Sequence, residues 1–254
     1  MKKAALAIFI LLGFFLFYKS SYQTPVLMYH HVGDSSEKSS LNVSTETFER
    51  QMEFLKLHHY RVMSFEDLMG HIQLGQRVPW NTMVITFDDG YLDNFVNAFP
   101  ILKKMNFPAA IFMITGNIGK NGWLSEEDLR VLDSSGITIG SHTVNHVFLP
   151  KLKKEEILSE LRQSRNQLEK ILGHPVFLFS YPAGGVTEEV KKLVAHEGYR
   201  GAVTTNYGKL HDDLYAFRRI KITERDGNLF SFWAKASGLY SLCRRHVKIN
   251  DYGE

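Results

Sequence analysis

The chain has 254 residues, of which 44% are hydrophobic and 22% are charged, the ordinary balance of a protein that buries a core. Its 30 lysines and arginines barely outnumber its 27 aspartates and glutamates, and Lys2, Lys3 and Lys19 account for the excess. Disordered, collagen-like and multispan membrane classes are therefore disfavoured, and a body without a basic run is not expected to bind nucleic acid. The single cysteine, Cys243, excludes an intrachain disulfide, so a metal site must use histidines and carboxylates.

An apolar segment opens the chain. Residues 4–18 carry no charge, follow two lysines and precede Lys19, a pattern typical of an export signal. Fifteen residues of helix reach about 22 Å, short of a hydrocarbon layer of roughly 30 Å. Cleavage and anchoring both stay open, and we favour an uncleaved anchor because no Ala-x-Ala site follows the run and no cysteine is there for lipidation. We expect residues 1–22 to be this signal peptide or membrane anchor, with the body exported.

The body, residues 23–254, alternates short apolar runs with amphipathic stretches, which predicts a parallel sheet covered by helices. We read it as one domain. The predicted strands are Pro25–His30, Met83–Phe87, Ala109–Ile114, Ile137–Gly140, Val176–Phe179 and Gly201–Thr205. The predicted helices are Ser44–His58, a short one starting at Ser64, Asp93–Met105, Ser125–Leu132, Lys154–Leu172 and Thr187–His196. This α/β order suits a barrel or an open wound sheet, and both place their sites at the carboxyl ends of strands.

The first polar motif is Thr86-Phe87-Asp88-Asp89-Gly90, where a hydrophobic strand ends in two adjacent carboxylates. Neighbouring side chains within a strand face opposite ways. At the end of the strand, however, Gly90 permits a sharp turn, so that both carboxylates can converge on one pocket. The alternative is a pair of solvated turn acids, because Asp-Gly is common in turns.

The second motif is Ser141-His142-Thr143-Val144-Asn145-His146, which also follows a predicted strand. Two histidines four residues apart on a helical turn present both imidazoles on one side, where they can bind one metal ion. The chain has 11 histidines, so a pair at this spacing also arises by chance. The position of this pair after a predicted strand is the stronger evidence for a metal site. Two imidazoles and one carboxylate are the usual three protein ligands of a hydrolytic divalent metal.

The third motif is Phe179-Ser180-Tyr181-Pro182-Ala183-Gly184-Gly185. Proline fixes the backbone, and the small residues after it expose their N–H groups to a ligand such as a polarised carbonyl oxygen. The alternative is a plain strand-to-helix turn. Tyr181, Trp123 and Trp233 can stack on sugar rings, although isolated aromatic residues more often belong to the core.

These three motifs, in this order and at strand ends, resemble the polysaccharide deacetylases that share the NodB homology domain, carbohydrate esterase family 4. The resemblance covers about residues 24–230. It implies a distorted (β/α) barrel and a hydrolase that removes N-acetyl groups from amino-sugar polymers with a divalent metal, usually zinc. Carried over onto this chain, it implies Asp88 as the general base and Asp89, His142 and His146 as metal ligands. It also implies Tyr181, Pro182 and Ala183 at the substrate, with the Ala183 N–H helping to hold the oxyanion.

Two positions depart from the family pattern. Ser180 stands where many members have an arginine that steadies the base, and the late Leu-x-His motif that supplies the general acid is absent. The segment Leu27-Met28-Tyr29-His30-His31-Val32 resembles instead the branch that includes poly-N-acetylglucosamine deacetylases, in which an early histidine replaces the late one. We therefore expect His30 to be the general acid and Arg219 to be a partner of Asp88 beside the substrate. The alternatives are a hydrogen-bonded core histidine and a solvated surface arginine.

The sequence thus predicts a metal-dependent deacetylase of cell-wall or exopolysaccharide N-acetylglucosamine, either secreted or anchored on the outer face of the cytoplasmic membrane. Three other functions stay open. A glycosidase needs two carboxylates roughly 5 to 9.5 Å apart across a bond, which adjacent aspartates beside two histidines suit poorly. A non-catalytic, exported carbohydrate-binding relative is disfavoured because both aspartates and both histidines are present. The sequence does not distinguish a polysaccharide deacetylase from an enzyme that deacetylates a non-sugar amide.

Overall fold

The computed structural model describes residues 22–34, 40–205 and 213–240, together with Phe9, Gly13 and Tyr18. Most of the predicted leader and the last fourteen residues of the predicted domain therefore lie outside the described residues. Within the part of the chain that is described, no helix combines the length and the apolar character needed to cross a bilayer.

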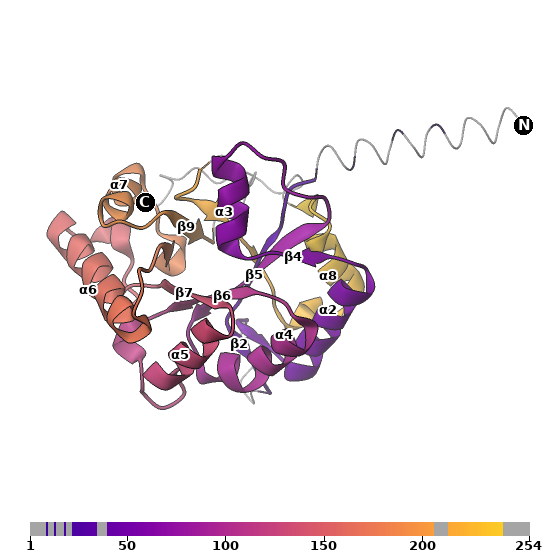
Figure 1. Ribbon diagram of the computed structural model, residues 1–254, viewed down its shortest axis with the longest axis horizontal. Helices are drawn as coiled ribbons and strands as arrows, with labels where there is room; N and C mark the ends of the chain where they lie inside the picture. The colour runs from indigo at the N-terminus through magenta and orange to yellow at the C-terminus, as the bar shows by residue number, and fades with distance from the viewer. Residues whose placement is uncertain are drawn as a thin grey trace, which may run out of the picture.

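A parallel sheet forms the centre of the fold, and helices surround it (Figure 1). In the described residues the sheet has nine strands, in the order β10-β9-β8-β7-β6-β5-β1-β11, with β4 also paired to β5. They are β1 (Val26–Tyr29), β4 (Arg61–Val62), β5 (Thr82–Asp89), β6 (Ala109–Met113), β7 (Ile137–Ser141), β8 (Leu178–Ser180), β9 (Gly201–Thr204), β10 (Phe217–Arg218) and β11 (Ile220–Lys221). A separate short pair joins β2 (His31–Val32) to β3 (Asn42–Val43).

The two edges of this sheet meet at Arg219. Strand β10 pairs with β9 at one edge, β11 pairs with β1 at the other, and Arg219 is the single residue between β10 and β11. The sheet therefore curls into a nearly closed barrel. The distorted (β/α) barrel implied by the family resemblance is confirmed, and the open wound sheet is the wrong alternative.

The helices begin where the sequence places their caps. They are α2 (Thr45–Leu57), α3 (Phe65–Gln73), α4 (Phe99–Met105), α5 (Glu126–Ser134), α6 (Lys154–Leu172), α7 (Glu188–His196) and α8 (Leu229–Ala236). The hydroxyls of Ser44 and Ser64 each accept a hydrogen bond from the first turn of their helix, and Ser125 forms a capping box with Asp128. Gly173 ends α6 with a φ of 80°.

One predicted helix changes its winding. Residues 93–105 form a π-helical segment, Asn94–Ala98, followed by α4. Pro100 lies in the first turn of α4 and has no N–H to donate to the carbonyl four residues earlier. The regular ladder is therefore interrupted where the sequence pattern alone predicts a continuous helix.

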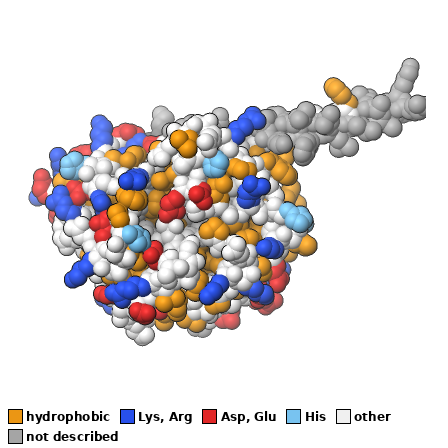
Figure 2. Space-filling view, viewed as in Figure 1, with side chains coloured by type: hydrophobic (Ala, Val, Ile, Leu, Met, Phe, Trp, Pro, Cys, Tyr) orange, Lys and Arg blue, Asp and Glu red, His pale blue; other side chains and the backbone are white. Residues whose placement is uncertain are grey.

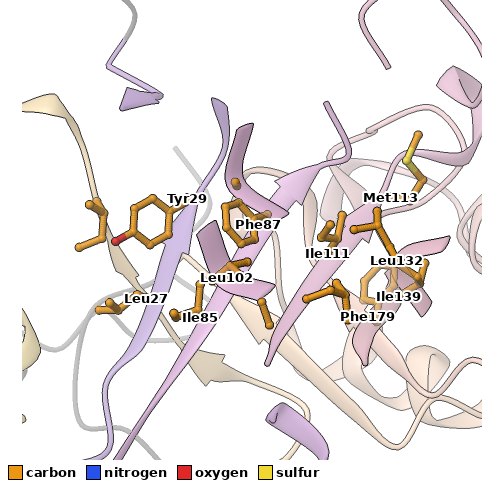
Figure 3. Packing of buried hydrophobic residues seen from close by; sticks show 14 of the residues in the cluster. Leu27, Tyr29, Ile85, Phe87, Leu102, Ile111, Met113, Leu132, Ile139 and Phe179 are labelled. Carbon is orange, nitrogen blue, oxygen red and sulfur yellow. The ribbon is translucent and has the colours of Figure 1, made fainter. Parts of the chain in front are cut away.

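Alternation along the strands divides the core into two clusters. In β6, Ala109 and Ile111 belong to the larger cluster, which is packed under the outer helices, whereas Ala110 and Phe112 belong to a smaller one with residues of α3. Figure 3 shows members of the larger cluster, including Ile111, contributed by neighbouring strands. All eight residues of β5 are buried, so this strand is a rigid support for the residues at its carboxyl end.

Candidate active site

The turn after β5 brings two buried carboxylates to the end of the barrel. Asp89 and Gly90 have φ values of 75° and 85°, in the left-handed region. A Cβ atom at Gly90 would lie 2.1 Å from the Met113 sulfur, so only glycine fits this close approach. Asp88 is 2% exposed and Asp89 is 6% exposed. The predicted sharp turn is confirmed, and the two acids are not solvated turn residues.

Asp89, His142 and His146 form a cluster that could hold a metal ion. One ligand atom from each of the three lies within 4.8 Å of the others. Asp89 Oδ1 is 3.5 Å from His142 Nε2 and 3.7 Å from His146 Nε2. Asp89 and His142 are buried, whereas the His146 side chain is 41% exposed. The cluster therefore opens to solvent on the His146 side.

The loop after β7, rather than a helical turn, brings the two histidines together. Thr143 and His146 have φ values of 64° and 54°, in the left-handed region, and residues 142–148 form no helix, so the helical turn expected from the spacing is wrong. The His146 N–H donates to the Thr143 hydroxyl at 2.9 Å. Side chains four residues apart thus reach the same point by way of left-handed backbone, which no helical periodicity predicts.

Glu160 on α6 holds this loop from outside. Its Oε2 accepts hydrogen bonds from the N–H groups of Val144 and Asn145 at 2.8 and 3.0 Å. Its Oε1 accepts a third bond from the Asn145 side-chain amide at 2.6 Å. The carboxylate therefore satisfies backbone donors between the two histidines, a role that the sequence analysis missed because Glu160 lies in a helix beyond the motif.

The donor set fits a divalent metal. His142 Nδ1 lies 2.7 Å from the carbonyl oxygen of Ser180, which can only accept, so Nδ1 carries the proton and Nε2 keeps its lone pair towards Asp89. Burial lowers the pKa of His142, against the opposing effect of the nearby aspartates. A neutral imidazole oriented by a backbone carbonyl is the form that binds zinc and similar ions.

Asp88 does not join this cluster but forms a buried ion pair with Arg219. The two guanidinium nitrogens donate to its two carboxylate oxygens at 2.6 and 2.5 Å. Arg219 is 1% exposed, so the predicted partnership is confirmed and the surface alternative is wrong. The guanidinium also donates to the Ser180 hydroxyl at 2.9 Å. The third motif lacks the arginine that many family members have there. Arg219, at the junction of the two barrel edges, lies beside Asp88 instead and contacts Ser180, which stands at that motif position.

This pair keeps Asp88 ionised. Burial by itself would raise the pKa of Asp88, but the positive charge of Arg219, aided by His142 and His30, holds that pKa well below its usual range. Arg219 donates a further bond to the Thr86 hydroxyl at 3.2 Å. A carboxylate that is charged, buried and outside the metal cluster is suited to accept a proton.

His30 lies at the same end of the barrel. Its pKa is lowered by burial and responds to the charges of Asp88 and Asp89, which raise it, and of Arg219, which lowers it. Its Nδ1 atom is buried and has no hydrogen-bond partner in the described residues. Tyr29 pairs with Phe87 in the parallel β1–β5 register, so His30 follows at the level of Asp88. It lacks the Nδ1 hydrogen bond that a purely structural core histidine would be expected to make.

The third motif divides between core and surface. Tyr181 is fully buried and its hydroxyl donates to the Tyr215 carbonyl at 2.8 Å, so its side chain belongs to the core, the alternative that the sequence left open. Pro182 is also buried. Ala183 is exposed, with a φ of 51°, at the tip of the turn. Of the four residues predicted to lie at the substrate, only Ala183 is exposed, because Arg219 is buried like Tyr181 and Pro182.

Tyr91, beside the aspartates, was not found from the sequence, whereas its neighbour Trp123 was named there as a ring that can stack on sugars. The Tyr91 ring stacks on His31 with centroids 3.4 Å apart and lies 4.6 Å from the Trp123 ring. His31 Nδ1 is 2.6 Å from an oxygen of Asp93. Burial and a hydrogen bond to Asp89 both raise the pKa of the Tyr91 hydroxyl. Tyr91 thus links the metal cluster to an aromatic wall that includes Trp123.

The sequence model of the polysaccharide deacetylase family matches residues 75–202. The chain belongs to the polysaccharide deacetylase family. The matched range contains the three motifs and therefore Asp88, Asp89, both histidines and Ala183, whereas His30 and Arg219 lie outside it.

Individual members of the polysaccharide deacetylase family agree. YxkH of Bacillus subtilis (strain 168), a protein named as a polysaccharide deacetylase, is 33% identical over 201 residues, covering 78% of this chain and 71% of YxkH. The poly-β-1,6-N-acetyl-D-glucosamine N-deacetylase of Staphylococcus aureus (strain MRSA252) is 26% identical over 180 residues, which are 65% of this chain and 62% of that enzyme. The solved Streptococcus pyogenes deacetylase PplD, in complex with acetate, superposes with a TM-score of 0.77 at 26% identity, over 83% of this chain and 98% of that one.

Proposed function

We propose that the chain is a metal-dependent hydrolase that removes N-acetyl groups from polymers of N-acetylglucosamine. The observation that carries the proposal is the division of labour between two adjacent aspartates. Asp89 lies with His142 and His146 in a metal-binding arrangement, while Asp88 is kept out of it and ionised by Arg219. Hydrolysis of an amide needs both an electrophilic centre and a separate base.

An acetamide resists water because its carbonyl is a poor electrophile and its nitrogen a poor leaving group. A divalent metal held by Asp89, His142 and His146 would supply a Lewis acid that polarises the carbonyl and makes a water acidic, and we propose zinc because two imidazoles and one carboxylate are its usual ligands. The buried carboxylate of Asp88 takes the proton from the attacking water, because its ionised form is maintained over the working pH range. Arg219 positions this carboxylate through both oxygens.

The leaving nitrogen requires a proton donor. His30 is proposed for this role because it lies at the level of Asp88, and the charges of both aspartates favour its protonated form. The exposed turn at Ala183 is proposed to donate its N–H to the oxygen that gains negative charge. Pro182 fixes this turn, and Tyr181 supports it from the core rather than contacting a sugar ring.

The substrate class is inferred from the relatives. The staphylococcal relative acts on poly-β-1,6-N-acetyl-D-glucosamine, and acetate, which is present in the streptococcal structure, is the acid that N-deacetylation releases. Trp123 and Tyr91 offer an aromatic wall next to the metal cluster for a sugar ring. Peptidoglycan and short chitin oligomers present the same acetamide and are the alternative substrates.

Export of the protein belongs to the same proposal. The uncharged run 4–18 between lysines is the sequence feature that supports it. An N-acetylglucosamine polymer outside the cell requires the body on the outer face of the cytoplasmic membrane, either anchored there or released. We propose the anchored form, because no Ala-x-Ala site follows the run.

The proposal is tested by metal content and amine release measured on the same preparation. Mass spectrometry should find one divalent metal per chain, and N-acetylglucosamine oligomers, poly-N-acetylglucosamine and peptidoglycan should be offered in parallel with detection of free amines. Chelation should abolish amine release and added zinc should restore it. A chain that binds metal and sugar but releases no amine from any of them would instead be a non-catalytic binding relative.

A further inference from the structure

A second surface feature lies at the opposite end of the barrel. A hollow of about 460 Å³ is lined by rings from α2, α8 and the approach to β5. Its exposed hydrophobic residues are Trp80, Phe230 and Trp233, which are 40%, 73% and 43% exposed, and His58 is exposed beside them. Figure 2 shows hydrophobic side chains reaching the surface on the right of the view, where Figure 1 places α2 and α8. We call this feature, with its lining residue Tyr18, the aromatic hollow.

The aromatic hollow is separated from the metal cluster by the length of β5. Trp80 and Asn81 line the hollow and immediately precede Thr82, the first residue of β5, whereas Asp89 is its last. Eight residues of strand span about 25 Å. The hollow is therefore too distant to contact an acetamide bound at the metal cluster.

Tyr18 connects the hollow to the apolar segment. Its hydroxyl donates to the Ser237 carbonyl at 2.8 Å, and its ring lies edge-on to those of Trp80 and Tyr22, at 6.3 Å in each case. The Tyr22 hydroxyl in turn donates to the Thr82 carbonyl at 2.8 Å. Tyr18 is also the last residue of the uncharged run 4–18. The apolar segment thus ends at the wall of the hollow.

We propose that the aromatic hollow docks on the surface of the lipid bilayer that holds the apolar segment. Tryptophan and tyrosine concentrate at the boundary between hydrocarbon and water, since their rings are apolar with a polar edge. None of the nine residues that line the hollow is acidic, so docking on lipid would bury no carboxylate there. The exposed Phe230 side chain, at the N-terminal end of α8, supplies apolar area without a polar group.

Lipid is favoured over a sugar chain as the occupant because of this continuity. A residue of the apolar run forms part of the wall, so insertion of that run brings the hollow to the membrane surface without a further partner. The inference rests on the proposed anchoring and is independent of the deacetylase chemistry. Docking in this orientation turns the metal cluster away from the bilayer, towards polymer outside the cell.

The three tryptophans of the chain provide the test. Trp80 and Trp233 lie in the hollow, whereas Trp123 stacks beside the metal cluster. Three full-length variants that each keep one tryptophan and carry phenylalanine at the other two are reconstituted in phosphatidylcholine–phosphatidylglycerol vesicles. Part of the lipid carries a nitroxide near the headgroup, which quenches nearby indoles. We expect the Trp80 and Trp233 signals to fall to roughly half, while the Trp123 signal is unchanged.

The outcomes separate docking from anchoring. If the protein floats with the vesicles but none of the three signals is quenched, the chain is anchored and the docking proposal is wrong. If it does not float at all, anchoring and docking both fail. If lipid-free protein instead shows Trp80 and Trp233 signals that respond to N-acetylglucosamine oligomers, the hollow is a sugar site, which also overturns the proposal.

A surface variant gives an independent measurement. Phe230→Ser removes the most exposed ring of the hollow without touching the metal cluster, so amine release from a soluble oligomer should be unchanged. Quenching of Trp233, whose ring centroid is 5.6 Å from that of Phe230, should weaken at least twofold if the ring inserts. Val96→Ser, which alters an exposed side chain elsewhere at 58% exposure, is the control and should leave quenching unchanged. Unchanged quenching in the Phe230 variant would contradict the proposed docking.

Discussion

Arg219 and Asp88 form a two-pronged ion pair in the interior, although 131 residues of chain separate them. Arg219 is the residue at which the two edges of the barrel meet, and Asp88 is near the carboxyl end of β5. Closure of the barrel therefore also brings Arg219 to Asp88, and this contact keeps the proposed base ionised. A buried charge that loses its partner is strongly destabilising, by roughly 3 to 5 kcal/mol, so changes at this pair are best made conservatively.

The first prediction concerns Arg219→Lys. Burial raises the pKa of Asp88 and Arg219 lowers it. A lysine ammonium does not form the two-pronged contact with both oxygens, so the pKa of Asp88 should be higher in this variant. Since the base acts only when ionised, the acid limb of the kcat/KM profile should move to higher pH. The wild-type pair likewise contributes stability that is present above the ordinary aspartate pKa and is lost as pH falls. A lower rate with an unmoved acid limb would show that Arg219 does not control the base.

The second prediction separates the two aspartates from each other. Asp88→Asn should lower kcat by roughly 10² to 10⁴ while the metal stays bound, because Asp88 lies outside the cluster. His142→Ala should lose both metal and activity. Metal analysis and amine release on each purified variant check this pair of outcomes. Near-normal turnover in Asp88→Asn would remove Asp88 from the role of base.

Glu160 is the subject of the third prediction. Glu160→Ala removes the acceptor for three donors of the loop between the two histidines, so metal affinity should fall roughly 10- to 100-fold. Glu155→Ala, at an exposed position on the same helix, is the matched control. Competition with a chromophoric chelator measures both, and circular dichroism shows whether the fold is kept. Equal affinities in the two variants would mean that the loop holds its shape without Glu160.

The fourth prediction concerns His30. Burial lowers the pKa of His30 from its ordinary value, so its protonated fraction decreases as pH rises through that lowered pKa. A general acid at this position should therefore produce an alkaline decline in kcat, and His30→Gln should lower kcat roughly 10² to 10⁴-fold and abolish the decline. Metal content should not change in this variant. If the His30→Gln variant keeps the pH profile of the wild type, whether or not its kcat is lower, the proton donor is another group.

Much of the fold could be predicted because its long elements carry strong local signals. The helix Lys154–Leu172 has an apolar stripe and a terminal glycine, and its predicted bounds coincide with α6. The strands β10 and β11 were missed because two residues each give no periodicity, and their place is fixed only by pairing with β9 and β1. Tertiary contacts alone determine such short strands.

The candidate site was predictable to the same extent. The acids and histidines stand in compact motifs at strand ends, so their types and spacing indicated a cluster. The left-handed turns at Thr143 and His146 and the clamp from Glu160 left no local signal, since they depend on side chains packed from another element. Tyr91 was missed for a different reason: a tyrosine after a turn has no pattern until its ring is seen against His31.

The late position of Arg219 in the chain also determines the order in which the groups of the site are synthesised. During synthesis, every group of the metal cluster has been made by residue 146, whereas the guanidinium that compensates Asp88 follows 73 residues later. A chain that ends between these two points carries the metal ligands but lacks the cation that pairs with Asp88. The proposed base is therefore compensated only after the last strands of the barrel have been made.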